Sequence, residues 1–204
     1  MSTSFTRRAA LAVAVLVALL AGCSSTPVTP SIQADVTGQP VQVRTDVSAA
    51  TARRFQMALD ALEAGQLQDA EAMLLALTED EPELAGPWVN LAHIYSSGGQ
   101  DEAAQAALNH ALAANPDHCP ARNALGVLLR KQGDFELAEQ QYRSCLDANP
   151  EFVDAWLNLG ILYELYLGRW GEALEAYRLY QQLSSAPDPR VRGWVMDLER
   201  RVDA

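Results

Sequence analysis

Hydrophobic and polar positions recur at a fixed interval along most of the chain. The prolines Pro82, Pro116 and Pro150 are each separated by 34 residues, and leucines and small residues keep the same spacing. A glycine divides each interval and the proline closes it, which predicts two helices per interval. A fixed period of this length is typical of stacked repeats that bury a continuous core only together.

Small residues predict how the two helices of each unit pack. Only small side chains let two helices approach closely, and larger apolar residues then fill the layers between units. Glycines at the ends of the first helices are expected to take a left-handed backbone conformation; they are Gly65, Gly99, Gly133 and Gly168. The small residues expected to face each other are Ala92 with Ala104, Gly126 with Ala138 and Gly160 with Ala173.

The end of the repeat array has two features of its own. One residue is inserted in the fourth unit, within residues 164–170, which predicts a looser turn there. After the last unit, Asp188 suits a helix N-cap and Pro189 suits the first helical position. The apolar residues that follow share one helical face, as the cap of a solenoid requires; they are Val191, Trp194, Val195, Leu198 and Val202.

The repeated positions resemble the tetratricopeptide repeat, whose pattern is W-x2-L-G-x2-Y, then A-x3-F, then P. The second unit matches at Trp88, Leu91, Tyr95 and Ala104, whereas the third has Arg122 in place of the tryptophan. The resemblance implies an all-α fold, a right-handed superhelix of helix-turn-helix repeats. It places four repeats within residues 48–187, at about 51–84, 85–118, 119–152 and 153–187, and a capping helix at 188–204.

The first 22 residues have the pattern of an export signal. Arg7 and Arg8 precede an apolar run of 12 residues, which spans about 18 Å as a helix and is too short for a membrane core of about 30 Å. The sequence Leu20-Ala21-Gly22-Cys23 resembles the bacterial lipoprotein lipobox, which implies cleavage before Cys23 and lipidation of Cys23. Residues 23–47, rich in proline, serine and threonine, are expected to form a flexible, disordered tether.

The lipobox resemblance also predicts where the protein acts. In that family an aspartate after the cysteine often marks retention in the inner membrane. Ser24 at this place therefore indicates the outer membrane of a Gram-negative cell, with the folded part facing the periplasm. In an oxidising compartment, Cys119 and Cys145, at neighbouring ends of the two helices of the third repeat, are expected to form a disulfide. Two buried free thiols are the alternative.

The functional surface implied by the repeat family is the concave groove along the first helices. Its positions here are mostly apolar with a few polar points, which suits an apolar segment or an amphipathic helix. The family's lysine, arginine and asparagine clamp for a terminal carboxylate is missing, because Phe55 and Leu59 occupy two of its places. The groove residues are Phe55, Leu59, Leu62, Val89, His93, Ser96, Asn123, Val127, Arg130, Leu157, Ile161 and Glu164.

Charge and motif content argue against several other functions. The formal net charge is −11, and no cluster of lysines and arginines is available to bind nucleic acid. The histidines His93, His110 and His118 are not paired at metal-ligand spacing, and no nucleophile elbow or phosphate-binding loop is present. We therefore expect no enzyme activity, no metal, no cofactor and no small-molecule substrate.

These features favour a non-catalytic, lipid-anchored scaffold that holds a protein partner of the cell envelope through its groove. The chain resembles lipoproteins such as the type IV pilus pilotin, which escorts a secretin, and a partner in a TonB-type motor fits equally. The alternative is a regulator that docks or activates a peptidoglycan synthase or hydrolase. A scaffold predicts stable co-purification of several components, whereas a regulator predicts a changed rate in its partner.

Overall fold

The computed structural model describes residues 32–34, 40–42 and 47–202. From residue 47 onward the described chain is helical. Its helices are α1 (Ala49–Glu63), α2 (Leu67–Asp80), α3 (Ala85–Ser97), α4 (Asp101–Ala114), α5 (Cys119–Gln132), α6 (Phe135–Ala148), α7 (Val153–Leu162), α8 (Trp170–Leu183) and α9 (Pro189–Val202), with a π-helical turn at Tyr163–Leu167 between α7 and α8. None of these helices is long and apolar enough to cross a membrane.

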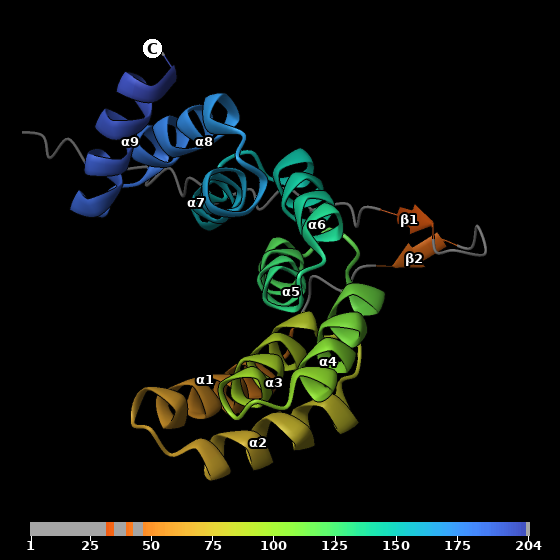
Figure 1. Ribbon diagram of the computed structural model, residues 1–204. Helices are drawn as coiled ribbons and strands as arrows, with labels where there is room; N and C mark the ends of the chain where they lie inside the picture. The colour runs from red at the N-terminus through yellow and green to blue at the C-terminus, as the bar shows by residue number, and fades with distance from the viewer. Residues whose placement is uncertain (1–31, 35–39, 43–46, 203–204) are drawn as a thin grey trace, which may run out of the picture.

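The helices form one curved stack of antiparallel pairs (Figure 1). In each repeat the first helix (α1, α3, α5 or α7) packs against the second (α2, α4, α6 or α8), and each second helix packs against the next first helix. The first helices lie on the inner, concave side of the curve, and α2, α4 and α6 lie on its outer side (Figure 1). The predicted all-α superhelix of helix-turn-helix repeats is confirmed.

Glycines and prolines set the helix boundaries as the spacing predicts. The glycine after each first helix has a positive φ, between +63° and +92°, a conformation that residues with a Cβ rarely adopt. The second helices α2, α4 and α6 end two residues before Pro82, Pro116 and Pro150. Since proline restricts the residue before it to extended conformations, it fixes the stop.

A side-chain N–H at one repeated position ties three repeats to the turn before them. The indole Nε1 atoms of Trp88 and Trp156 donate to the carbonyl oxygen of the proline six residues earlier, at 3.0 and 2.8 Å. In the third repeat, Arg122 Nε donates to the equivalent proline carbonyl at 2.7 Å. Arg122 therefore preserves the hydrogen bond of the tryptophan that it replaces.

The two helices of a pair do not pack small residue against small residue, although the sequence predicts this. A Cβ atom built on Gly126 or Gly160 would lie 2.5 Å from the ring of Tyr142 or Tyr177, and the nearest atoms are those of the rings rather than of Ala138 or Ala173. Both rings are fully buried. The glycines are needed because a tyrosine ring, not a small residue, lies across the pair.

The inserted residue of the fourth repeat is absorbed inside a helix, which corrects the expectation of a looser turn. Residues 163–167 form a π-helical turn that continues α7, and Gly168 then reverses the chain with φ of +63°. One extra residue per turn is the usual origin of a π bulge. Tyr163, at the repeat position that Tyr95 and Leu129 occupy in the second and third repeats, begins this turn and is 2% exposed.

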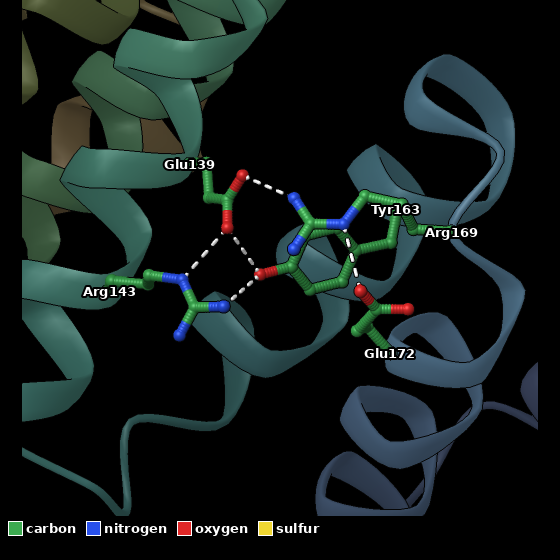
Figure 2. Close-up of polar contacts among 5 residues, drawn as sticks. All are labelled: Glu139, Arg143, Tyr163, Arg169 and Glu172. Carbon is green, nitrogen blue, oxygen red and sulfur yellow. Dashed lines mark hydrogen bonds and ion pairs between the residues drawn. The ribbon is translucent and has the colours of Figure 1, made fainter.

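Tyr163 is the centre of a polar network that joins these two repeats (Figure 2). Its hydroxyl donates to Glu139 Oε1 at 2.8 Å and accepts from Arg143 at 2.7 Å. Arg169 donates to Glu139 Oε2 at 2.8 Å and to Glu172 at 2.9 Å, and its guanidinium lies 4.5 Å from the centre of the Tyr163 ring. The network joins α6 to the π-helical turn and to the start of α8.

The last helix covers the end of the stack. Helix α9 begins at Pro189, and the Asp188 carboxylate accepts the Arg190 N–H at 2.8 Å, as the predicted cap requires. Val191 and Leu198 are fully buried against α8, whereas the Val202 side chain, expected on the same face, is 47% exposed. Val202 lies in the last described turn of α9, beyond the end of the surface that α8 offers.

The segment before α1 lies mostly outside the described residues, including the signal segment and Cys23. Within it, the strands β1 (Ile32–Ala34) and β2 (Pro40–Gln42) pair antiparallel, with Gln33 opposite Val41. The rest of the predicted tether, residues 23–31, 35–39 and 43–46, lies outside the described residues. A lone two-stranded pair is marginally stable in water, so it adds little to the core formed by the helices.

Candidate functional site: the concave face

The concave face has a cavity near the N-terminal end of the stack. Here α1, the start of α3 and the turn before α5 enclose a cavity of about 540 Å³. Its walls are mainly apolar and include the predicted groove residues Phe55 and Leu59, together with residues of the first two repeats. The lining residues are Val47, Thr51, Ala52, Phe55, Gln56, Leu59, Glu83, Leu84, Ala85, Gly86, Pro87, Asn115 and His118.

A smaller cavity continues the concave face between α3 and α5. It has a volume of about 100 Å³ and brings together four predicted groove residues from two repeats. Val127 is 37% exposed at its rim. These four residues are His93, Ser96, Asn123 and Val127.

Other predicted groove residues are engaged within the protein. Leu62, Leu157 and Ile161 are half-buried and pack against the core, and Val89 is 5% exposed and belongs to it. Val89 therefore offers almost no surface to a partner. Glu164 accepts a hydrogen bond from the hydroxyl of Tyr177 at 2.9 Å.

Polar residues of the groove form a short chain across α5 and α7. The Asn158 amide donates to Asn123 Oδ1 at 3.0 Å, and Arg130 donates weakly to the Asn158 carbonyl at 3.5 Å. The Arg130 guanidinium also lies 5.8 Å from the centre of the Tyr166 ring. Arg130 is thus held at the surface of the groove by neutral neighbours.

The two cysteines of the third repeat lie together, away from the groove. The structure joins Cys119 and Cys145 as a disulfide, with Cα atoms 4.6 Å apart. Both residues are buried, at 4% and 0% exposure. The bond would link the start of α5 to the end of α6 and hold the third repeat together.

The histidines serve structural roles in the part of the chain that is described. His110 stacks on Trp88 with ring centroids 4.5 Å apart. His118 caps α5, where its Nδ1 accepts the Ala121 N–H at 3.3 Å, and burial lowers its pKa. Among these residues, histidine, cysteine and acidic side chains form no group of three that could hold a metal ion.

Sequence reasoning missed the part of the cavity that comes from the edges of the repeats. Ala52 and Gln56 lie at helical spacing from Phe55 and Leu59, so the periodicity of α1 could have added them to the groove. Pro87 and His118 belong to the second repeat. They reach the cavity through the packing of one repeat on the next, which the pattern within one helix does not predict.

Comparison with known proteins identifies the repeat. Sequence models described as tetratricopeptide repeat match residues 61–126 and 123–187. The chain is a tetratricopeptide-repeat protein. These matches span more than half of the chain and include the 34-residue period, the proline stops and the glycine turns described above.

Solved tetratricopeptide structures share the fold. The structure reported as the functional characterisation of Pseudomonas aeruginosa pilF has a TM-score of 0.68 and 23% identity, over 76% of this chain and 69% of that one. MamA from Desulfovibrio magneticus RS-1 has a TM-score of 0.61 and 18% identity, over 78% and 88% of the two chains. At these identities the likeness shows the architecture alone.

Curated relatives match over a small part of their own length. The mouse DnaJ homolog subfamily C member 3 is 30% identical over 104 residues, which are 51% of this chain and 21% of that protein. The mouse Superkiller complex protein 3 is 26% identical over 133 residues, 63% of this chain and 8% of that protein. The chain thus spans about a fifth or less of these relatives, and what is shared is the repeat.

Proposed function

We propose that this tetratricopeptide-repeat protein is a non-catalytic adaptor that holds a protein partner on its concave face. One observation carries the proposal: α1, the start of α3 and the turn before α5 form a cavity of about 540 Å³ with mainly apolar walls, and a smaller cavity lies around Val127 between α3 and α5. Concave apolar surfaces with a few polar points are the usual form of a binding site. Repeat solenoids present such surfaces to extended partners.

The adaptor acts, in this proposal, from a lipid anchor on Cys23 in the outer membrane, facing the periplasm. The lipobox and the serine after Cys23 support the anchor. Stable membrane attachment needs more than one acyl chain, which bacterial lipoproteins carry. The partner is then an envelope protein. The fold shared with pilF of Pseudomonas aeruginosa makes an envelope assembly such as a pilus or secretin complex the first to examine.

The test uses the chain from Ser24 onward as bait in detergent-solubilised envelope of the native cell. The concave variant carries Leu59→Glu and Val127→Glu. A glutamate on each apolar wall must be desolvated when a partner docks, so retention of a true partner should fall by about tenfold or more.

The matched control carries Leu75→Glu and Leu137→Glu, which change two exposed leucines of α2 and α6 on the outer side. Both double variants are checked for unchanged helix content and thermal unfolding. A protein retained by the wild type and the control but lost by the concave variant supports the adaptor. Equal retention by all three would place the interface elsewhere and refute the concave site.

A further inference from the structure

Charge is distributed unevenly along the stack. Residues 47–118, which hold the first two repeats, contain two basic and eleven acidic residues, a formal charge of −9. Residues 119–202 contain ten basic and twelve acidic residues, a formal charge of −2. The large cavity lies in the acidic half, with Glu83 in its wall. Glu81 and Asp60 accept hydrogen bonds from the wall residues Thr51 and Gln56, so a partner that docks there meets an apolar surface bordered by acidic side chains.

Polar side chains in the walls of this cavity are already engaged. Thr51 bonds to Ser48 and Glu81, and Gln56 donates to Asp60 at 2.8 Å. Asn115 accepts the Asp117 N–H at 3.1 Å, and His118 accepts the Ala121 N–H at 3.3 Å. Because the walls are mainly apolar and their polar side chains already bond within the protein, the cavity offers few groups that could pair with the backbone of an incoming chain.

This restricts the conformation of the partner segment. An extended peptide would bury backbone N–H and C=O groups without partners, which is unfavourable because buried polar groups lose their hydrogen bonds to water. A helix satisfies its own backbone groups and presents only side chains. The walls thus favour an amphipathic helix that lays apolar residues at i, i+3, i+4 and i+7 into the cavity.

We propose that the cavity formed by α1, α3 and the turn before α5 binds an amphipathic helix of the partner whose polar face is rich in lysine and arginine. This inference rests on the proposed adaptor function and names the chemistry of its partner. The apolar walls select the helix and the −9 charge of the first two repeats selects the basic face. The chain's own residues before α1 are a poor occupant, because Pro27, Pro30 and Pro40 interrupt them.

The experiment measures binding of two fluorescent peptides to the purified full-length chain by anisotropy. Both are amphipathic helices of about five turns with leucine on one face; one has lysine on the other face and its counterpart has glutamate. The lysine peptide should bind about tenfold or more tightly than the glutamate peptide, with an affinity that falls as salt is raised.

Two variants locate the site. Ala52→Trp fills the cavity from an exposed position of α1, and Ala76→Trp makes the same change at an exposed position of the outer helix α2. Only Ala52→Trp should weaken the lysine peptide, by about tenfold. Equal effects of the two substitutions, or tighter binding after removal of residues 24–46, would overturn the assignment of this cavity to a partner helix.

The outcomes separate this inference from the adaptor function. Equal affinity for the lysine and glutamate peptides, or no binding of either, overturns the basic helix as occupant. The adaptor function would still be supported if the wild type captures an envelope partner and the Leu59→Glu, Val127→Glu variant does not. If the peptides bind with equal affinity and the envelope partner is retained equally by the wild type and the concave variant, both the basic helix and the adaptor function are overturned.

Discussion

At the scale of single residues, the repeats match a small residue on one helix to a large one on the other. Where the second helix carries tyrosine, as at Tyr142, the first carries glycine; where it carries Leu108, the first carries Ala92. The Tyr142 ring occupies the space that a Cβ atom on Gly126 would need. Burial raises the pKa of Tyr142 to about 12, so the residue acts at neutral pH as a neutral, space-filling ring.

This matching predicts that Gly126→Ala destabilises the protein. The new methyl would lie 2.5 Å from the Tyr142 ring. Overpacking of this kind costs about 1–3 kcal/mol, more than the gain in helix propensity of about 1 kcal/mol. Urea unfolding measures the difference. Adding Tyr142→Leu, which reproduces the Ala92 and Leu108 pair, should recover part of the loss.

A second glycine serves as the control. A Cβ atom on Gly193, inside α9, would meet nothing within 4 Å. Gly193→Ala should therefore stabilise the protein, by up to about 1 kcal/mol. If Gly126→Ala also stabilises it, close packing against the tyrosine ring is not the reason for the glycine.

The cysteine pair gives a second prediction at this scale. The bond between Cys119 and Cys145 closes a loop with a sequence separation of 26 residues, which corresponds to about 3–4 kcal/mol of stabilisation in the chain-entropy account. Thiol titration of the unreduced, denatured chain from Ser24 onward should find no free thiol. Finding both thiols would show two buried free cysteines, and reduction would then leave the unfolding midpoint unchanged.

At the scale of elements, the π-helical turn and the network around Glu139 set the junction between the third and fourth repeats (Figure 2). Desolvation acts to raise the pKa of Glu139, but hydrogen bonds from Tyr163 and Arg143 and the charge of Arg169 outweigh it and lower the pKa overall. Burial and the bond to Glu139 raise the pKa of Tyr163 to about 12. The network is therefore fully charged at neutral pH, apart from the neutral tyrosine.

The sign of the Glu139 shift predicts a pH dependence. A folded-state pKa below the ordinary value of 4.5 means that the carboxylate stabilises the fold above that pH and loses this contribution as the pH falls through the lowered value. Glu139→Gln should cost about 1–3 kcal/mol at pH 7, since it weakens charge-assisted hydrogen bonds. Urea unfolding should show the gap closing below pH 4.5. A gap of constant size would mean that Glu139 acts by packing alone.

Helices that begin or end at a glycine, a proline or a capping residue could be predicted from the sequence. The glycine turns and proline stops gave the eight repeat helices, and Asp188 with Pro189 gave the start of α9. The π turn could not be predicted from the sequence. An inserted residue can lengthen a loop or form a bulge inside a helix, and the local sequence pattern is the same in both cases. The Glu139 network joins residues 139 to 172 across two repeats and has no period that would reveal it.

At the scale of the whole molecule, the stacking of repeats creates the candidate site. Phe55 and Leu59 follow from their places in the first repeat, whereas Pro87 and His118 come from the second repeat and line the same cavity. The curvature of the stack leaves the outer helices facing away from any partner held in the groove (Figure 1). The function of the whole molecule therefore depends on whether a partner protein covers the concave face in the cell.

The most direct test of the adaptor is a photo-crosslinking amino acid placed in the full-length chain in living cells. One site is Val127, 37% exposed on the concave face, and the other is Leu137, 50% exposed on the outer helix α6. The adaptor predicts a discrete, light-dependent adduct from Val127 that mass spectrometry identifies as one envelope protein, and no such adduct from Leu137. A specific adduct from Leu137 with none from Val127 would contradict the concave face as the partner site.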